Sequence, residues 1–178
     1  LFLDDDICLE PGVLTAHVAS HEETRDVACL GLAYPRPPAR PNAVDMWTRK
    51  RYEALVARLV NEGRFRSPRD ASTVNLSVSR RAAMDVGGFC EDFQFYGKED
   101  VEFVYRLTKA GIELRLLPQA VLYHWFGKSL ALFVRQRVQV AQNDLLLREL
   151  HPELGRFLEC DSAVPSWSSR KRLFFRSL

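Results

Sequence analysis

Short apolar segments with the length of β-strands alternate along this chain with longer segments of helical periodicity. The strand-like segments are 1–3, 27–34, 73–79, 112–117 and 120–124. One helix begins after Pro11-Gly12, and further helical segments cover 43–62, 80–85, 99–110 and 129–149. Strands that alternate with helices predict an α/β fold, with a mixed sheet flanked by helices.

The length of 178 residues suits one domain, and the charge excludes one class of function. The chain has 25 Lys+Arg and 23 Asp+Glu, a net charge of +2. A dedicated nucleic-acid binder would show a stronger basic excess. No apolar run reaches the ~18 residues that would span a bilayer. Because the chain begins inside an apolar run, at Leu1, we expect it to be a piece of a longer protein.

Three aspartates, Asp4, Asp5 and Asp6, follow the first apolar run. Carboxylates this close repel one another unless a cation neutralises them. Alternate side chains of a strand point the same way, so Asp4 and Asp6 can aim their oxygens at one point. That arrangement suits Mg²⁺ or Mn²⁺. The alternative is an Asp-rich turn or helix cap, although a cap usually needs only one aspartate.

Three further motifs each have a structural and a functional interpretation. Gly87-Gly88 either makes a turn or lets the backbone approach a ligand closely. Glu99-Asp100 opens a helix, where acidic side chains oppose the helix dipole. His124 ends an apolar strand and is either a satisfied interior residue or a metal ligand.

The C-terminal part of the chain carries two apolar patterns. The helix at 129–149 has a stripe formed by Leu130, Phe133, Val134, Val138, Ala141 and Leu145. The last segment, 170–176, combines basic residues with Phe174 and Phe175. This tail is either a solvated terminus or a contact with an anionic membrane surface. We expect a cytoplasmic protein, and peripheral membrane contact through this tail is the alternative.

The order and spacing of these motifs resemble the GT-A-fold glycosyltransferases, most closely the large bacterial family 2 of inverting enzymes. Phe2-Leu3-Asp4-Asp5-Asp6 resembles the family's Asp-x-Asp motif, and residues 75–81 resemble the strand before its acceptor site. Gly87-Gly88-Phe89 resembles the glycine-rich loop, residues 97–100 the Glu-Asp motif, and His124 the metal-binding histidine. The chain departs from the family pattern at two positions, Cys90 and Lys98, where Asp and a small residue are usual.

The resemblance implies a metal-dependent transfer of a sugar from a nucleotide diphosphate sugar. Asp6 and His124, with Asp4, would hold Mn²⁺ or Mg²⁺, and Asp4 facing the ribose is the alternative. The donor would be contacted by Asp4, Asp5 and Asp6 and by Gly87 and Gly88.

The acceptor side is also implied by the resemblance. Asp100 would act as the general base for a hydroxyl of a glycan, a lipid-linked acceptor or another acceptor. Glu99 would hydrogen-bond the acceptor or position Asp100. Attack from the face opposite the diphosphate would invert the anomeric configuration.

By the same resemblance, residues 1–128 would form the C-terminal half of a GT-A catalytic domain, from the Asp-x-Asp strand to the metal-binding histidine. Residues 129–178 would form a helical extension and the basic tail. The family's upstream nucleotide-binding βαβ unit is missing, so we expect this segment alone to bind nucleotide poorly and to be inactive. The alternatives are a truncated or degenerate module without activity of its own, and a metal-dependent phosphohydrolase that uses the three aspartates.

Overall fold

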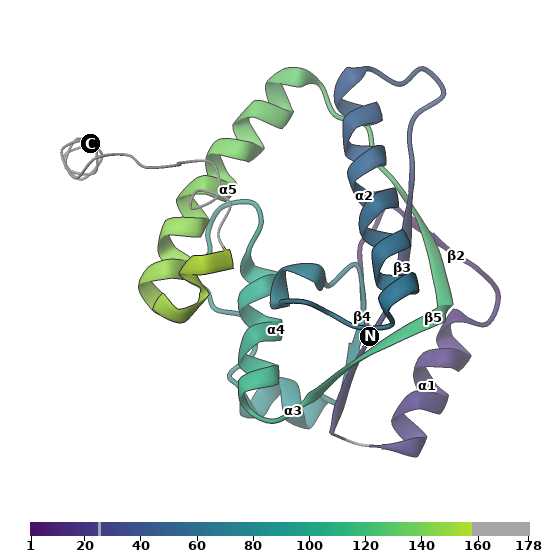
Figure 1. Ribbon diagram of the computed structural model, residues 1–178, viewed down its shortest axis with the longest axis vertical. Helices are drawn as coiled ribbons and strands as arrows, with labels where there is room; N and C mark the ends of the chain where they lie inside the picture. Colours follow the sequence, from purple (N-terminus) through teal and green to yellow (C-terminus); the bar gives the residue numbers. More distant parts are fainter. Residues whose placement is uncertain (25, 158–178) are drawn as a thin grey trace.

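The computed structural model describes residues 1–24 and 26–157, which form a five-stranded mixed sheet flanked by helices (Figure 1). The strands are β1 (Phe2–Leu3), β2 (Ile7–Leu9), β3 (Val27–Arg36), β4 (Asn75–Val78) and β5 (Glu113–Trp125). The helices are α1 (Val13–Glu23), α2 (Ala43–Glu62), α3 (Arg80–Asp85), α4 (Glu99–Lys109) and α5 (Leu130–Leu150), with 3₁₀ turns η1 (Pro68–Asp70) and η2 (Pro152–Phe157). The predicted α/β class is confirmed. The basic tail at 170–176 lies outside the described residues.

The sheet is built around β3, and its strand order is β1-β4-β3-β5-β2. β3 pairs parallel with β5, and the other three pairings are antiparallel. On one face of β3, Ala28 and Leu30 pack in a cluster with Phe103 of α4. On the other face, Cys29 packs in a cluster with Val13 of α1. A strand buried on both faces appears in a sequence as a continuous apolar run, which is why residues 27–34 were recognisable.

β5 is a single strand of 13 residues, so the prediction of two separate strands at 112–117 and 120–124 was wrong. Gly31 of β3 pairs with Leu117, whereas the next residue, Leu32, pairs with Val121. Three residues of β5, 118–120, therefore have no partner in the register and form a bulge. Pro118 lacks a backbone N–H and is tolerated where the ladder is interrupted. After the bulge, β5 resumes its pairing with β3, and its C-terminal half also pairs with the edge strand β2.

The side chain of Asn75 fills the space beside this bulge. Its Nδ2 donates to the carbonyl oxygen of Ala120 at 2.9 Å and to that of Leu32 at 3.3 Å. Both carbonyls would otherwise be buried where the bulge interrupts the ladder. Gly31 leaves the room for this side chain, because a Cβ at that position would lie 2.1 Å from Asn75 Nδ2.

A buried hydrogen-bond chain continues from Asn75 to α1. The ring of His17 lies between Asn75 Oδ1, 3.0 Å from Nε2, and Ser77 Oγ, 2.7 Å from Nδ1. Because the amide of Asn75 already donates to the two carbonyls, its Oδ1 accepts from His17 Nε2–H. Nδ1 then accepts the Ser77 hydroxyl proton, and His21 Nε2 donates to Ser77 Oγ at 2.8 Å. Burial lowers the pKa of both histidines, in agreement with neutral rings.

Several apolar side chains of β1 and α1 lie at the surface. β1 is a two-residue edge strand and not a buried one, with Leu3 exposed. In α1, Val13 and His17 are buried, but Leu14 and Val18 face outward. α2 matches the predicted bounds of 43–62 and ends at Gly63 in a left-handed conformation.

α5 shows the largest departure from an ordinary amphipathic helix. An apolar stripe is usually the buried face of a helix. Here the side chains that point inward are Val140, Asn143, Asp144 and Leu147, whereas much of the apolar stripe is exposed. Neither α5 nor another helix in residues 1–24 and 26–157 is long and apolar enough to cross a membrane.

The Asn75 contacts generate a stability prediction. Asn75→Leu removes the donor to two buried carbonyls and the acceptor of the His17 ring, and it places a larger apolar group beside the bulge. We expect the free energy of unfolding to fall by about 3 kcal/mol. The control Asn61→Leu changes the same residue type on the exposed side of α2 and should cost no more than about 0.5 kcal/mol. Urea denaturation measures both, and equal values would contradict this role for Asn75.

Candidate active site

The three aspartates form the connection between β1 and β2. β1 pairs with β4, whereas β2 pairs with the C-terminal part of β5, so this connection runs from one edge of the sheet to the other. Ile7 is the register partner of His124, and Trp125 N–H donates to the carbonyl oxygen of Asp6 at 2.9 Å. Strand pairing therefore holds Asp6 beside His124.

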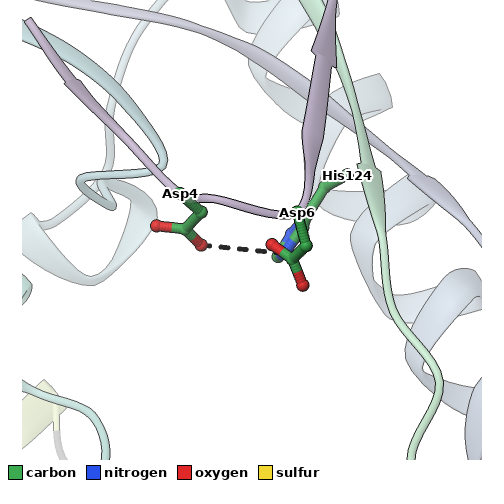
Figure 2. A group of neighbouring side chains, drawn as sticks. All are labelled: Asp4, Asp6 and His124. Atoms are coloured by element: carbon green, nitrogen blue, oxygen red, sulfur yellow. Dashed lines mark ion pairs between the residues drawn. The ribbon is translucent and has the colours of Figure 1, made fainter.

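Asp4, Asp6 and His124 meet at one point, as Figure 2 shows. His124 Nε2 lies 2.8 Å from Asp6 Oδ1 and 3.6 Å from Asp4 Oδ2, and one ligand atom from each residue lies within 4.8 Å of the others. Two carboxylate oxygens and an imidazole nitrogen suit Mn²⁺, and Mg²⁺ through the carboxylates. Asp5 is exposed and does not belong to this group.

The electrostatics of Asp4 favour a nearby positive charge. Partial burial raises the pKa of this carboxyl, and the charges of Asp6 and Asp5 raise it further. His124 acts in the opposite direction and stabilises the ionised form. A divalent cation bound between the carboxylates would act in the same direction as His124.

A cavity of about 330 Å³ adjoins the three side chains. Besides the aspartates and His124, its polar lining includes Thr48, Tyr52, Tyr96, Lys128 and Gln136. Its size is within the range of small-molecule sites. A larger hollow of about 630 Å³ lies between α1 and β5, but its lining includes one carboxylate, Glu23, which pairs with Arg115. We therefore place the candidate site in the smaller cavity.

Lys128 brings a cation into this cavity and was not recognised from the sequence. Its backbone is held by the N-terminus of α2, because its N–H donates to Asp45 Oδ1 at 3.0 Å and its carbonyl oxygen accepts from Asn42 Nδ2 at 2.8 Å. Its Nζ lies 3.2 Å from the hydroxyl of Tyr96. Burial lowers the pKa of Lys128, and Asp6 opposes that shift. The spacing from Asn42 to Asp45 is visible in the sequence as a helix capping box. That these two residues also bind the backbone of Lys128 depends on the fold.

Asp100 lies near the same cavity without being part of its lining. Burial raises the pKa of Tyr52 and Tyr96, and the charges of both Asp4 and Asp100 add to the shift in each. The two tyrosines therefore lie within electrostatic range of both carboxylates. Burial, followed by the charge of Glu99, raises the pKa of Asp100 to about 6. Such a value suits a general base that works near neutral pH.

Glu99 precedes Asp100 in the first turn of α4. Its Oε2 is buried and has no hydrogen-bond partner among residues 1–24 and 26–157. A buried carboxylate oxygen without a donor is costly. A hydroxyl group of a bound acceptor could supply the missing hydrogen bond.

The inward face of α5 holds the start of α4. Lys98 has a φ of 84°, which is unusual for a residue with a side chain. Its Nζ pairs with Asp144 Oδ1 at 3.0 Å, and the two side chains are only 9% and 2% exposed. The neighbouring Asn143 donates to the carbonyl oxygens of Phe95 and Gly97 at 3.0 and 2.5 Å. Lys98, one of the two departures from the family pattern, is therefore bound to α5 through Asp144. It directly precedes Glu99 and Asp100 in the chain.

Gly87 and Gly88 end α3. Gly87 N–H donates to Met84 O at 2.9 Å, and Gly88 N–H donates to Ala83 O at 2.8 Å, with φ values of 86° and 69°. Arg106 donates to Gly88 O at 2.6 Å. This is a helix C-cap that needs positive φ. The two glycines are not among the cavity-lining residues, and their role in donor binding stays a prediction.

The geometry of Asp4, Asp6 and His124 predicts that these residues bind Mn²⁺. Asp6→Asn and His124→Ala each remove a ligand and should weaken Mn²⁺ binding by about tenfold or more. Asp5→Asn is the matched control, since it removes a neighbouring charge outside the group, and it should change the affinity by about twofold at most. Electron paramagnetic resonance of free Mn²⁺ measures the affinities. Equal losses in all three variants would exclude a defined site.

The Lys98–Asp144 pair generates a double-mutant prediction. Asp144→Asn leaves Lys98 buried without a counter-charge and should lower the free energy of unfolding by about 3 kcal/mol. Adding Lys98→Gly removes that charge and relieves the positive φ, which costs about 1 kcal/mol for a residue with a side chain. The double variant should therefore be more stable than Asp144→Asn alone in urea denaturation. A double variant less stable than the single one would contradict this account of the pair.

Comparison with known proteins identifies the family of this chain. The family model for glycosyl transferase family group 2 matches residues 1–167. No curated protein matches the chain. The matched segment contains the Asp4–Asp6 connection, the start of α4 and His124, which were the basis of the resemblance seen in the sequence. The chain belongs to glycosyl transferase family group 2.

Proposed function

We propose that this chain takes part in transferring a sugar from a nucleoside diphosphate sugar to an acceptor hydroxyl, with inversion at the anomeric carbon. Family membership supports a transferase. The observation that carries the finer proposal is the meeting of Asp4, Asp6 and His124 beside a cavity with a lysine and two tyrosines. A donor of this kind has a negatively charged diphosphate. In the proposed site, a metal ion held by the acidic group and the ammonium group of Lys128 would both offset that charge.

The leaving diphosphate requires charge stabilisation. A divalent cation held by Asp4, Asp6 and His124 would offset the negative charge that grows on the diphosphate as its bond to the sugar breaks. Lys128, fixed through its backbone by Asn42 and Asp45, would contribute a second positive charge from the lining of the cavity. The phenol groups of Tyr52 and Tyr96 would donate hydrogen bonds, because their raised pKa values keep them protonated.

The acceptor hydroxyl requires a base. In the proposed step, the acceptor oxygen forms a bond to the anomeric carbon while the bond from that carbon to the diphosphate oxygen breaks. The bonding electron pair leaves with the diphosphate, and the hydroxyl proton moves to the Asp100 carboxylate. A pKa of about 6 leaves most of this carboxylate ionised at pH 7. Glu99, whose buried Oε2 has no partner within the described part of the chain, would accept a hydrogen bond from the acceptor.

The proposed role of Asp100 predicts both a mutational effect and a pH dependence. The assay uses the protein as its gene encodes it, with Mn²⁺, a panel of nucleoside diphosphate sugars and hydroxyl acceptors, and it measures release of nucleoside diphosphate. Asp100→Asn should lower the transfer rate by about 10²–10⁴-fold. The wild-type kcat/KM should fall about tenfold per pH unit below pH 6, because the base becomes protonated.

The control for this experiment is Asp85→Asn, which changes an exposed aspartate on α3 and should retain the wild-type rate. Unchanged turnover in Asp100→Asn would remove Asp100 as the base. Release of phosphate from a simple phosphate ester, without sugar transfer, would favour the phosphohydrolase alternative. Absence of any turnover in the gene-encoded protein across the panel would favour a module without activity.

A further inference from the structure

α5 presents an apolar face to the outside of the molecule. Four side chains of this face are between 53% and 66% exposed: Leu130, Val134, Val138 and Leu145. They recur at intervals that place them on one side of the helix. The opposite side is occupied by the contacts that hold the start of α4, so α5 cannot turn its apolar side inward without breaking the Lys98–Asp144 pair.

α2 extends this apolar face. The two helices come together at their N-terminal ends and diverge toward their C-terminal ends (Figure 1). Trp47 of α2 packs edge-on against Phe133 of α5, with ring centroids 5.3 Å apart. Trp47 and its neighbour Met46 are 46% and 48% exposed. We call the joint face, formed by Met46, Trp47, Leu130, Val134 and Val138 with the flanking Lys50 and Arg135, the α2–α5 surface.

Basic residues predominate on these two segments. Residues 42–52 and 130–143 contain five basic residues: Arg49, Lys50, Arg51, Arg135 and Arg137. Their single acidic residue is Asp45, which is buried and engaged in the α2 cap. The next carboxylate along α2, Glu53, pairs with Arg49. Arg51 stacks over the Trp47 ring at 4.8 Å, so basic and aromatic groups are interleaved.

We propose that the α2–α5 surface docks on an anionic lipid bilayer. Exposed aliphatic side chains would enter the boundary between headgroups and acyl chains, and Trp47 would lie at that depth with its ring N–H toward water. Lys50 and Arg135 would contact lipid phosphates, since each basic residue near such a surface contributes to binding. A second copy of the chain is the alternative occupant, and self-association is an outcome of the test below.

Docking would bring the candidate site to the membrane. The cavity beside His124 is lined by Thr48 and Tyr52 from α2 and by Leu132 and Gln136 from α5, the two helices that carry the surface. An acceptor anchored in the same bilayer would therefore reach the cavity from the side of these helices. The delivery of an acceptor to the cavity rests on the proposed function, whereas docking on the bilayer does not.

The test is co-sedimentation of the full chain with vesicles, without nucleotide sugar. The probes are phosphatidylcholine vesicles and vesicles with about 30% phosphatidylglycerol. We expect binding to the anionic vesicles that weakens as salt rises. The double variant Val134→Glu/Val138→Glu should lower the partition coefficient by about tenfold or more. Both positions are exposed, so the fold should be retained, which circular dichroism checks.

The matched control is Leu14→Glu/Val18→Glu on α1, which changes two side chains that are 54% and 58% exposed and adds the same charge. Its binding should stay within about threefold of the wild type. A second variant, Lys50→Ser/Arg135→Ser, should lose about fivefold per removed charge on anionic vesicles only. The basic tail is intact in all variants, so any difference reports the α2–α5 surface.

Several outcomes would overturn the proposal. One is a wild-type chain that does not bind anionic vesicles. Another is an equal loss of binding in the α1 and α5 variants, and a third is binding that none of the variants changes. Self-association of the wild type that Val134→Glu/Val138→Glu abolishes, without vesicle binding, would assign the surface to a second copy of the chain instead. None of these outcomes bears on sugar transfer, so the proposed function is tested separately.

Discussion

The amide of Asn75 occupies the one place where β5 leaves its register with β3, and the candidate site depends on it. By donating to the carbonyls of Leu32 and Ala120, it satisfies backbone groups that the bulge would leave buried and unpaired. Both halves of β5 then pair with β3, and the C-terminal half also pairs with β2. That second pairing places His124 opposite Ile7 and therefore beside Asp6. A polar contact inside the sheet thus determines the geometry of the acidic cluster at its edge.

α5 has two faces with different tasks, which explains its unusual burial. Its inward side chain Asn143 holds the backbone of Phe95 and Gly97, and Asp144 pairs with the Lys98 side chain. Together they hold the start of α4, where Glu99 and Asp100 lie. Polar groups that are buried and paired fix the orientation of a helix strictly, because any rotation would leave them without partners. The apolar side then has no place in the core and remains at the surface beside α2.

Much of the site could be predicted from the sequence because the residues themselves carry strong physical signals. Adjacent carboxylates after an apolar run indicate a cation site, and the structure brings Asp4 and Asp6 together with His124. Their role as metal ligands, like the role of Asp100 as a base, stays a prediction. Lys128 and the tyrosines of the cavity could not be predicted, because a single lysine or tyrosine has no pattern until other elements surround it.

The sequence by itself determined the α/β class, the bounds of α2, the buried run of β3 and the family, because these follow from periodicity, continuous hydrophobicity and motif order. Only the tertiary structure decided that β5 is one bulged strand, that the polar residues of β4 are buried under α1, and that the apolar stripe of α5 faces outward. Each of these outcomes depends on a long-range partner: Asn75 for the bulge, His17 for Ser77, and Lys98 for Asp144. Local patterns report how a segment can fold, whereas hydrogen bonds and ion pairs between distant residues decide which of its faces becomes the interior.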